Sequence, residues 1–217
     1  MKTGTTAEKP ITTAEQVART LNVSRETLRQ LENYVEMLGR WQRSINLVSR
    51  HSLDDVWRRH ILDSGQLAQF LPSRPCRIMD IGSGAGLPGI VLAIMGAEAG
   101  HHCILVESDQ RKAAFLTQAA HHCGVKPEIR AERIENIEFC NTDFLTARAL
   151  APVDQLLKLS RTQHHAGLAC LFLKGKQLNK ELTCLADYPT VEWRVHDSAS
   201  DADGQILELR GFPEKYE

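Results

Sequence analysis

The sequence of 217 residues predicts an α/β fold in which a mostly parallel, seven-stranded sheet ends in an antiparallel hairpin and follows a helical extension. Residues 1–75 show helical periodicity and no strand pattern. After Pro75, short β-branched or apolar runs alternate with helical stretches, which is typical of βαβ units. The last two apolar runs flank SASDADG, whose Asp and Gly content suits a hairpin turn. We therefore expect an extension over 1–75 and a domain over 76–217.

The extension is expected to contain three helices. Thr13, with Gln16 three residues later, forms a capping-box pattern for a short helix to about Leu21. Ser24 opens a long helix, because apolar residues recur along it every three or four positions: Leu28, Leu31, Val35, Leu38, Trp41 and Ile45. Residues 46–51 are expected to form a connection, and a third amphipathic helix to run unbroken from Ser52 to about Phe70. Residues 1–12 are polar and are expected to fray.

The domain is expected to alternate strands with helices before its terminal hairpin. The expected strands occupy 76–81, 103–108, 128–131, 143–150 and 168–174, and the hairpin occupies 191–197 and 205–210. The expected helices occupy 88–96, 111–123, 132–137, 153–162 and 177–186. A parallel sheet that ends in an antiparallel hairpin differs from the simple doubled nucleotide-binding fold of dehydrogenases.

Composition places the chain among ordinary water-soluble proteins, with 42% hydrophobic and 24% charged residues. No apolar run reaches the roughly 20 residues of a membrane helix, and the first residues lack the apolar stretch of a signal peptide. We expect a cytoplasmic monomer with no membrane partner. The six cysteines are scattered without a CxxC pair, which argues against disulfides and a zinc ribbon. The triplet HHC occurs at 101–103 and 121–123, in an expected strand and helix end, and we expect no metal site.

The formal net charge of -1 does not indicate a general nucleic-acid binder, because affinity for phosphate backbone comes from concentrated Lys and Arg. A local basic face remains compatible with this balance. Its candidates are Arg40, Arg43, Arg50, Arg58 and Arg59, and later Arg111, Lys112, Arg130, Arg133, Arg148, Arg161, Lys174 and Lys176. For any single member of these sets, the alternative interpretation is a solvated helix face.

The stretch MDIGSGAGLPGI, residues 79–90, places a glycine-rich turn between an expected strand and its helix. Glycines such as Gly82 and Gly84 let the backbone turn tightly and let a ligand approach its N–H groups. A dinucleotide fingerprint would require a third glycine at position 87, which is Leu87, and Gly86 comes one residue early. The turn therefore predicts a nucleotide-like ligand that is not a dinucleotide.

Two carboxylates near strand ends define that ligand further. Asp80 precedes the turn, where a negative charge would repel a pyrophosphate and suit a cationic group. Glu107 follows the second strand, where a carboxylate binds the hydroxyls of a nucleoside sugar. Together they favour a nucleoside joined to a cation, and S-adenosylmethionine, a sulfonium with an amino-acid tail, fits. The alternatives are a turn or helix-cap role for Asp80 and a surface acid for Glu107.

Seven further stretches carry a resemblance that spans most of the chain. They are YVEMLGRWQRSINLVSR, RRHILDS, MDIGSGAGLPGI, VESDQRKAAFL, ERIENI, TARALAP and FLKGK. In these motifs the chain resembles the bacterial 16S ribosomal RNA guanine-N7 methyltransferases, also called methyltransferase G or glucose-inhibited division protein B. RHILDS beside DIGSGAGLPG is the specific part, because methyltransferases in general share only the glycine turn. The resemblance implies a class I S-adenosylmethionine-dependent methyltransferase fold, which is Rossmann-like, and 16S rRNA or the small ribosomal subunit as partner.

The resemblance also implies roles for individual residues. Gly82 and Leu87 would line the methionine and sugar side of the cofactor, and Glu107 would take the ribose hydroxyls. Ile134 and Glu135 would flank the adenine. Arg148 would lie at the mouth of the pocket, with a salt bridge to a nearby carboxylate as the alternative. His60 and Asp63, three apart on one helical face, are expected to anchor the extension to the domain rather than to contact substrate.

The implied reaction needs no general base, because guanine N7 already carries a free lone pair. Catalysis would then consist of aligning the reactants and excluding water, and we assign no catalytic side chain. Three alternatives stay open at this point. They are a methyltransferase acting on a small molecule or a protein, a binding protein that holds the cofactor without turnover, and a nucleotide oxidoreductase.

Overall fold

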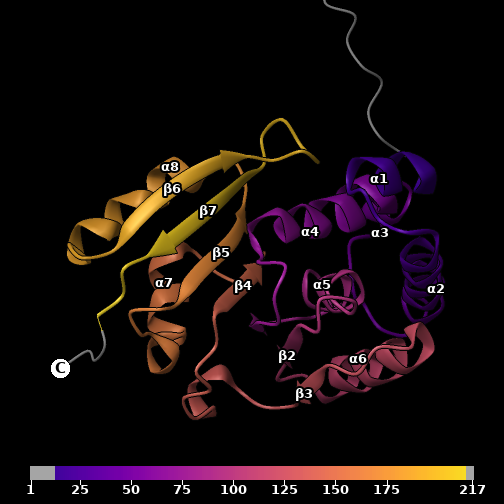
Figure 1. The fold of residues 1–217 in the computed structure, drawn as a ribbon, viewed down its shortest axis with the longest axis horizontal. Coiled ribbons are helices and arrows are strands. Elements are labelled where there is room, and N and C mark those ends of the chain that lie inside the picture. The colour runs from indigo at the N-terminus through magenta and orange to yellow at the C-terminus, as the bar shows by residue number, and fades with distance from the viewer. Residues whose placement is uncertain (1–12, 214–217) are drawn as a thin grey trace, which may run out of the picture.

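The computed structural model, which describes residues 13–213, contains a seven-stranded sheet with the order β3-β2-β1-β4-β5-β7-β6 (Figure 1). Strands β1 to β5 pair with one another in parallel, and β7 runs antiparallel to both β5 and β6. The predicted fold class is confirmed. The strands are β1 (Arg77–Ile81), β2 (His102–Val106), β3 (Glu128–Arg130), β4 (Phe144–Arg148), β5 (Ala169–Lys174), β6 (Glu192–Asp197) and β7 (Gln205–Arg210).

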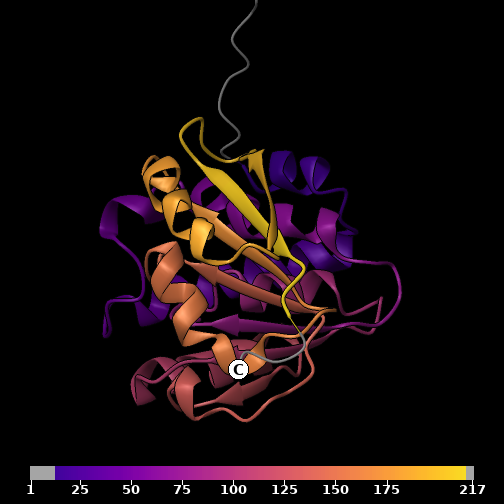
Figure 2. The ribbon, with the colours of Figure 1, turned by 90° about the vertical axis from the view of Figure 1, so that its left-hand side faces the viewer.

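Helices cover both faces of the sheet (Figures 1 and 2). One face carries α5 (Gly89–Met95), α6 (Gln110–Cys123) and the extension, and the other carries α7 (Val153–Leu159) and α8 (Leu178–Glu181). Alternate residues of β1 supply the two cores, because side chains along a strand point to opposite faces. Ile78 belongs to the first core and Met79 to the second.

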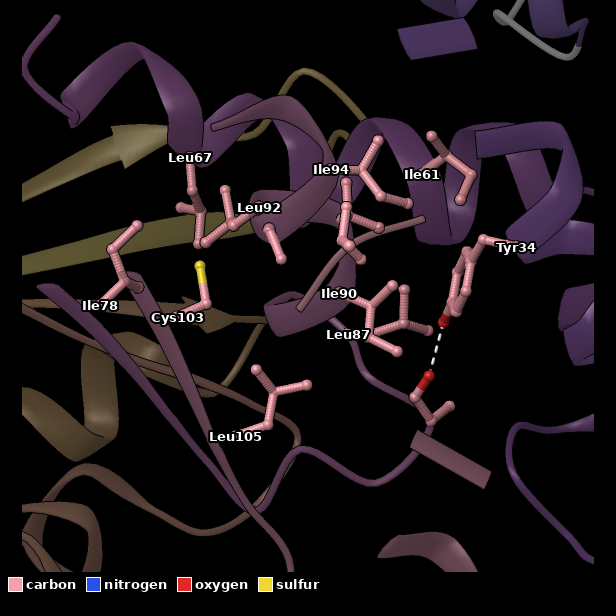
Figure 3. Close-up of a cluster of buried hydrophobic side chains, with 14 of the residues drawn as sticks. Tyr34, Ile61, Leu67, Ile78, Leu87, Ile90, Leu92, Ile94, Cys103 and Leu105 are labelled. Atoms are coloured by element: carbon pink, nitrogen blue, oxygen red, sulfur yellow. Dashed lines mark hydrogen bonds between the residues drawn. The ribbon is translucent and has the colours of Figure 1, made fainter. Parts of the chain in front are cut away.

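The extension has no separate core. Helices α1 (Ala14–Thr20) and α2 (Arg25–Trp41) begin at the predicted caps, Thr13 and Ser24. Leu31 and Leu38 of α2 are fully buried in the same cluster as Ile90 of α5 and Phe115 of α6, and Figure 3 shows part of this cluster. The extension is therefore positioned by the sheet domain. The prediction for residues 1–12 lies outside the described residues.

The unbroken helix predicted from Ser52 to Phe70 is wrong. The segment instead forms α3 (Arg50–Leu53), a turn, the π-helix η1 (Trp57–Leu62), α4 (Asp63–Gly65) and the 3-10 helix η2 (Gln66–Phe70). Tertiary contacts account for the change of pitch, because Arg58 donates to Ser200 O at 2.8 Å and the side chain of Gln66 accepts from Ala199 N at 2.7 Å. Apolar periodicity alone does not distinguish these helix types.

The turn between β6 and β7 makes those contacts. Residues 198–204 leave the sheet and pack on η1, α4 and η2, and Ser200 Oγ donates to Asp63 Oδ1 of α4 at 2.6 Å. The turn before β7 thus fixes the segment from η1 to η2 by these three hydrogen bonds.

The other expected strands and helices differ from the structure only in extent. The helix expected at 132–137 is reduced to η3 (Ile134–Asn136), and those after β4 and β5 continue as the 3-10 helices η4 (Arg161–Gln163) and η5 (Leu182–Asp187). All six cysteines are free, and four of them are buried.

Between residues 13 and 213, no cluster of His, Cys, Asp or Glu is arranged to hold a metal ion. Within that range no helix combines the length and apolar character that crossing a membrane requires.

Candidate cofactor site

The glycine turn between β1 and α5 has a backbone shape that only glycine adopts easily. Gly82, Gly84 and Gly86 have φ values of 64°, 55° and 82°, in the left-handed region that side chains disfavour. A Cβ at Gly86 would lie 2.7 Å from Ile90 Cγ1. At Gly84, by contrast, the nearest atom to an added Cβ would be Gly82 O at 3.7 Å. The turn is therefore rigidly shaped and open to a ligand at its centre.

Helix α2 holds this turn from the side of the extension. The hydroxyl of Tyr34 donates a hydrogen bond to Ala85 O at 2.6 Å, and the Tyr34 side chain is fully buried (Figure 3). Burial raises the pKa of Tyr34 far above its usual value, so the hydroxyl stays protonated and remains a donor. The sequence offered no signal for this contact beyond an apolar helix position.

Glu107 joins the glycine turn to the end of β2. Its Oε2 accepts from Gly84 N at 2.8 Å and its Oε1 from Asp109 N at 2.8 Å. The residue is 8% exposed. A carboxylate has about four acceptor positions, so two backbone donors leave capacity for the hydroxyls of a sugar. The two hydrogen bonds fix the orientation of the Glu107 carboxylate, and with it the direction of its remaining acceptor positions.

Asp80 does not reach the ligand side of the turn. It is 1% exposed, and its two oxygens accept from Gly89 N at 3.1 Å and from Thr146 Oγ1 at 3.0 Å. Burial raises the pKa of Asp80 to about 6. These contacts match the alternative interpretation of Asp80 as a residue that holds the turn and the start of α5, and not the prediction of a direct ligand contact.

The other seven predicted site residues line one cavity of about 350 Å³. They come from the glycine turn, the end of β2, η3 and the end of β4, which meet at the carboxyl edge of the sheet as expected for a parallel α/β fold. They are Gly82, Gly84, Leu87, Glu107, Ile134, Glu135 and Arg148.

Several lining residues were not predicted, and two of them come from the extension. Leu47 and Val48 lie in the segment after α2 that the sequence indicated only as a connection. Gln42 folds this segment back, because its Oε1 accepts from Leu47 N at 2.9 Å and Val48 N at 3.0 Å while its amide donates to Val48 O. Leu47 and Val48 are far in sequence from the strands whose ends form the cavity, so no local pattern indicates that they line it. The other additions include Ser83, Ala85, Ser108, Lys112, Glu132, Arg133, Ala149, Leu150 and Leu159.

Arg148 ends β4 and is bound by three groups, two from the π-helix η1 and one from the first residue of α4. It donates through Nη1 to Arg59 O at 3.0 Å and to Asp63 Oδ2 at 3.1 Å, and through Nη2 to His60 Nδ1 at 2.9 Å. The two interpretations of Arg148 therefore coexist, since it lines the cavity and also pairs with a carboxylate. The expected role of His60 and Asp63 as anchors of the extension is confirmed by these contacts.

His60 serves this network in its neutral form. It is 5% exposed, and burial together with the neighbouring Arg148 charge lowers the pKa of His60 to about 3. With Nδ1 accepting from Arg148, the proton lies on Nε2, which can donate to Ser52 Oγ at 2.9 Å. The π-helix η1 and the start of α4 thus place three acceptors around one guanidinium.

A second, larger cavity of about 690 Å³ adjoins the first. The two share Leu47, Val48, Arg148 and Ala149 as lining residues. The second cavity continues between η1, the end of β5, α8 and the turn before β7. Arg148 therefore stands at the boundary between the two spaces.

Residues 27–207 match the family model described as rRNA small subunit methyltransferase G. The chain belongs to this family. The family's ribosomal RNA small subunit methyltransferase G of Rhodospirillum rubrum is 43% identical over 197 residues, covering 91% of this chain and 96% of the relative. That of Cereibacter sphaeroides strain ATCC 17029 is 38% identical, covering 91% and 97%. The family resemblance predicted from the motifs is thus confirmed.

Solved structures establish the same fold at lower identity. An O-methyltransferase from Bacillus cereus in complex with SAH aligns with a TM-score of 0.62 at 15% identity, covering 91% of this chain and 96% of that one. Magnesium protoporphyrin IX methyltransferase from Synechocystis PCC 6803 with bound SAM aligns with a TM-score of 0.60 at 13% identity, covering 88% and 98%. These likenesses show that the methyltransferase G family chain has the class I methyltransferase fold.

Proposed function

We propose that this chain transfers a methyl group from S-adenosylmethionine to N7 of a guanine in 16S ribosomal RNA. The single observation that carries the proposal is the family match over residues 27–207, whose description names an rRNA small subunit methyltransferase. The cavity at the carboxyl edge of the sheet supports it, because this is where ligands bind in open α/β sheets.

The residues of the first cavity fit S-adenosylmethionine. Gly84 leaves its surroundings open to a ligand, which suits close approach of the methionine portion. Glu107 suits two sugar hydroxyls and opposes a pyrophosphate. Ile134 offers an apolar surface and Glu135 a polar group, as the two sides of an adenine need. Leu87 and Arg148 would complete the site near the methionine tail.

When bound, the cofactor supplies a methyl group attached to a positively charged sulfur. Guanine N7 has a free lone pair, so the chain needs no residue to remove a proton. Its own task is orientation and the exclusion of water. Leu47, Val48 and Leu150 give the cavity apolar walls, and Tyr34 fixes the turn beneath it. No side chain is required to act as an acid or a base.

The proposed partner is 16S rRNA or the small ribosomal subunit, which places the protein in the cytoplasm, and we propose that it acts there as a monomer. Basic residues at the rims of both cavities would contact RNA phosphates, which position a nucleic acid without reading its sequence. They include Lys112 and Arg133 at the first cavity and Arg59 and Lys176 at the second. With a net charge of -1, the shape of the folded RNA rather than bulk charge would select the substrate.

The modification state of the ribosome tests this proposal. In a strain without this protein, 16S rRNA should lose one 7-methylguanine, mapped by primer extension after borohydride and aniline cleavage. Returning the gene should restore the modification. An unchanged rRNA would contradict the proposal and favour a small-molecule or protein acceptor. A calorimetric titration that shows binding of NAD and none of S-adenosylmethionine would instead indicate an oxidoreductase.

A further inference from the structure

The second cavity has the position that an acceptor needs. It meets the first cavity at Arg148 and Ala149, and its volume of about 690 Å³ exceeds that of the first. A nucleotide flipped out of its RNA requires a pocket next to the methyl donor. The inference that follows rests on the proposed function, because it concerns what this second space receives.

Among the carboxylates that line this cavity, Glu181 is partly shielded from water and still has an oxygen free to accept a hydrogen bond. Its Oε2 accepts from Lys174 Nζ at 2.6 Å and from Val153 N at 2.9 Å, and its side chain is 19% exposed. No hydrogen bond within residues 13–213 engages its Oε1. Glu181 lines the second cavity and not the first. The carboxylate is therefore fixed by one oxygen and able to accept through the other.

The other carboxylates of the cavity are less suited to read a base. Both oxygens of Asp63 are already engaged, by Arg148 and by Ser200. Asp201 and Asp203 are exposed to water, and Asp203 pairs with Lys176. Water competes for hydrogen bonds at such exposed groups, which weakens any discrimination between bases.

We propose that the second cavity receives the acceptor guanine and that Glu181 recognises it. Guanine presents N1–H and the N2 amino group as neighbouring donors that the available Oε1 can accept, whereas adenine presents an acceptor at N1 and no amino group at C2. Methylation converts neutral guanine into a cation, since N7 forms the new N–C bond with its lone pair while the C–S bond breaks and leaves its electrons on sulfur. The negative charge of Glu181 stabilises that cation, and no proton moves.

The experiment compares matched glutamate variants of the full chain. E181Q keeps the size of the side chain and removes its charge, and E181D keeps the charge. The control is E208Q, because Glu208 is similarly buried and is likewise bound by a cation, the Arg210 guanidinium, and by the His196 ring, but lies outside both cavities. The measurements are the Kd of S-adenosylmethionine, the melting temperature, and kcat/KM for methyl transfer to small ribosomal subunits that lack the modification.

E181Q should lower kcat/KM by about 10- to 100-fold, the range for a lost hydrogen bond to a charged group. The kcat/KM of E181D should lie between that of E181Q and that of the unmodified protein. The Kd of S-adenosylmethionine should change less than about twofold, a range within the variation of surface substitutions. E208Q should leave kcat/KM unchanged. Equal effects of E181Q and E208Q on kcat/KM, or a parallel loss of cofactor binding in E181Q, would overturn the inference. If the unmodified protein transfers no methyl group to the subunits, the proposed function itself fails.

A second measurement avoids variants altogether. Millimolar 5′-GMP should inhibit methyl transfer by the unmodified protein in competition with small subunits, and 5′-AMP should not. Equal inhibition by both nucleotides, or by neither, would overturn guanine recognition in this cavity, even if E181Q fails to fold.

Discussion

The two adjoining cavities are assembled in different ways. The cofactor cavity is centred on one continuous turn, residues 82–87, which Glu107 binds through Gly84 N, and short runs at 106–108, 132–135, 148–150 and 47–48 complete its walls. The second cavity draws on five distant segments: residues 47–52, η1 with the start of α4, the end of β4, the stretch from β5 to α8, and the turn before β7. The comparison teaches that a locally encoded site can be read from a sequence, whereas a site made by tertiary contacts requires the structure.

The largest effect is expected at Arg148, where the two cavities meet. R148A removes three hydrogen bonds and leaves Asp63 without its cation, so kcat/KM for methyl transfer to small subunits should fall by about 100-fold or more. R148K keeps the charge but cannot reproduce the planar fork, and it should recover only part of the loss. Steady-state kinetics at varied cofactor and varied subunit concentration measure both effects. A variant that loses only one of the two affinities would show that the cavities are independent at this residue.

Glu107 should affect the cofactor side alone. In E107Q one oxygen is replaced by an amide nitrogen, which faces a backbone N–H and cannot accept from it. We expect the Kd of S-adenosylmethionine to rise by about 10- to 100-fold, measured by calorimetry, because two charge-assisted hydrogen bonds are disturbed. The KM for small subunits at saturating cofactor should stay within about twofold, the scale of substitutions away from a site. A comparable rise in that KM would contradict the division between the cavities.

Two buried titratable groups should give the two regions opposite pH dependence. Asp80 has its pKa raised from 3.8 to about 6, so the stability it contributes is present below pH 3.8 and is lost as pH rises through 6. His60 has its pKa lowered from 6.5 to about 3, so stability is lost as pH falls below 6.5. The two slopes oppose each other between about pH 4 and 6.

D80N should therefore make stability rise more steeply with pH in that window, and H60N should make it rise less steeply. Each slope should change by up to about 1.4 kcal/mol per pH unit, the value for one proton. Urea unfolding at several pH values measures the free energy of unfolding. Slopes that change in the same direction in both variants would contradict the assigned protonation states.

The smallest effect is expected for Y34F, which removes only the hydroxyl that holds Ala85 O. The free energy of unfolding should fall by about 1 kcal/mol, the usual value of one buried hydrogen bond. Since the contact fixes the glycine turn, cofactor affinity should weaken by a few-fold in calorimetry, while saturating cofactor should restore the rate. An unchanged affinity would show that the turn holds its shape without the extension.

Particular residues show how far the sequence could predict this protein. The succession of strands along the chain followed from alternating apolar runs, and seven of the eight site residues gather in one cavity because strand ends of a parallel sheet share an edge. Asp80 could not be separated from a ligand contact, since its partners Gly89 and Thr146 become neighbours only in the fold. The pitch of η1 depends on Ser200, about 140 residues away in sequence, and Leu47 and Val48 depend on a side-chain contact of Gln42.

We propose above all that this chain transfers a methyl group from a cofactor in one cavity to a guanine in the other. The most direct measurement incubates the purified protein with methyl-labelled S-adenosylmethionine and small ribosomal subunits from a strain that lacks it, followed by nucleoside analysis of the rRNA. The account predicts label in 7-methylguanosine, approaching one per subunit, and none in the other nucleosides. Label in another nucleoside, in ribosomal protein, or in neither would contradict it.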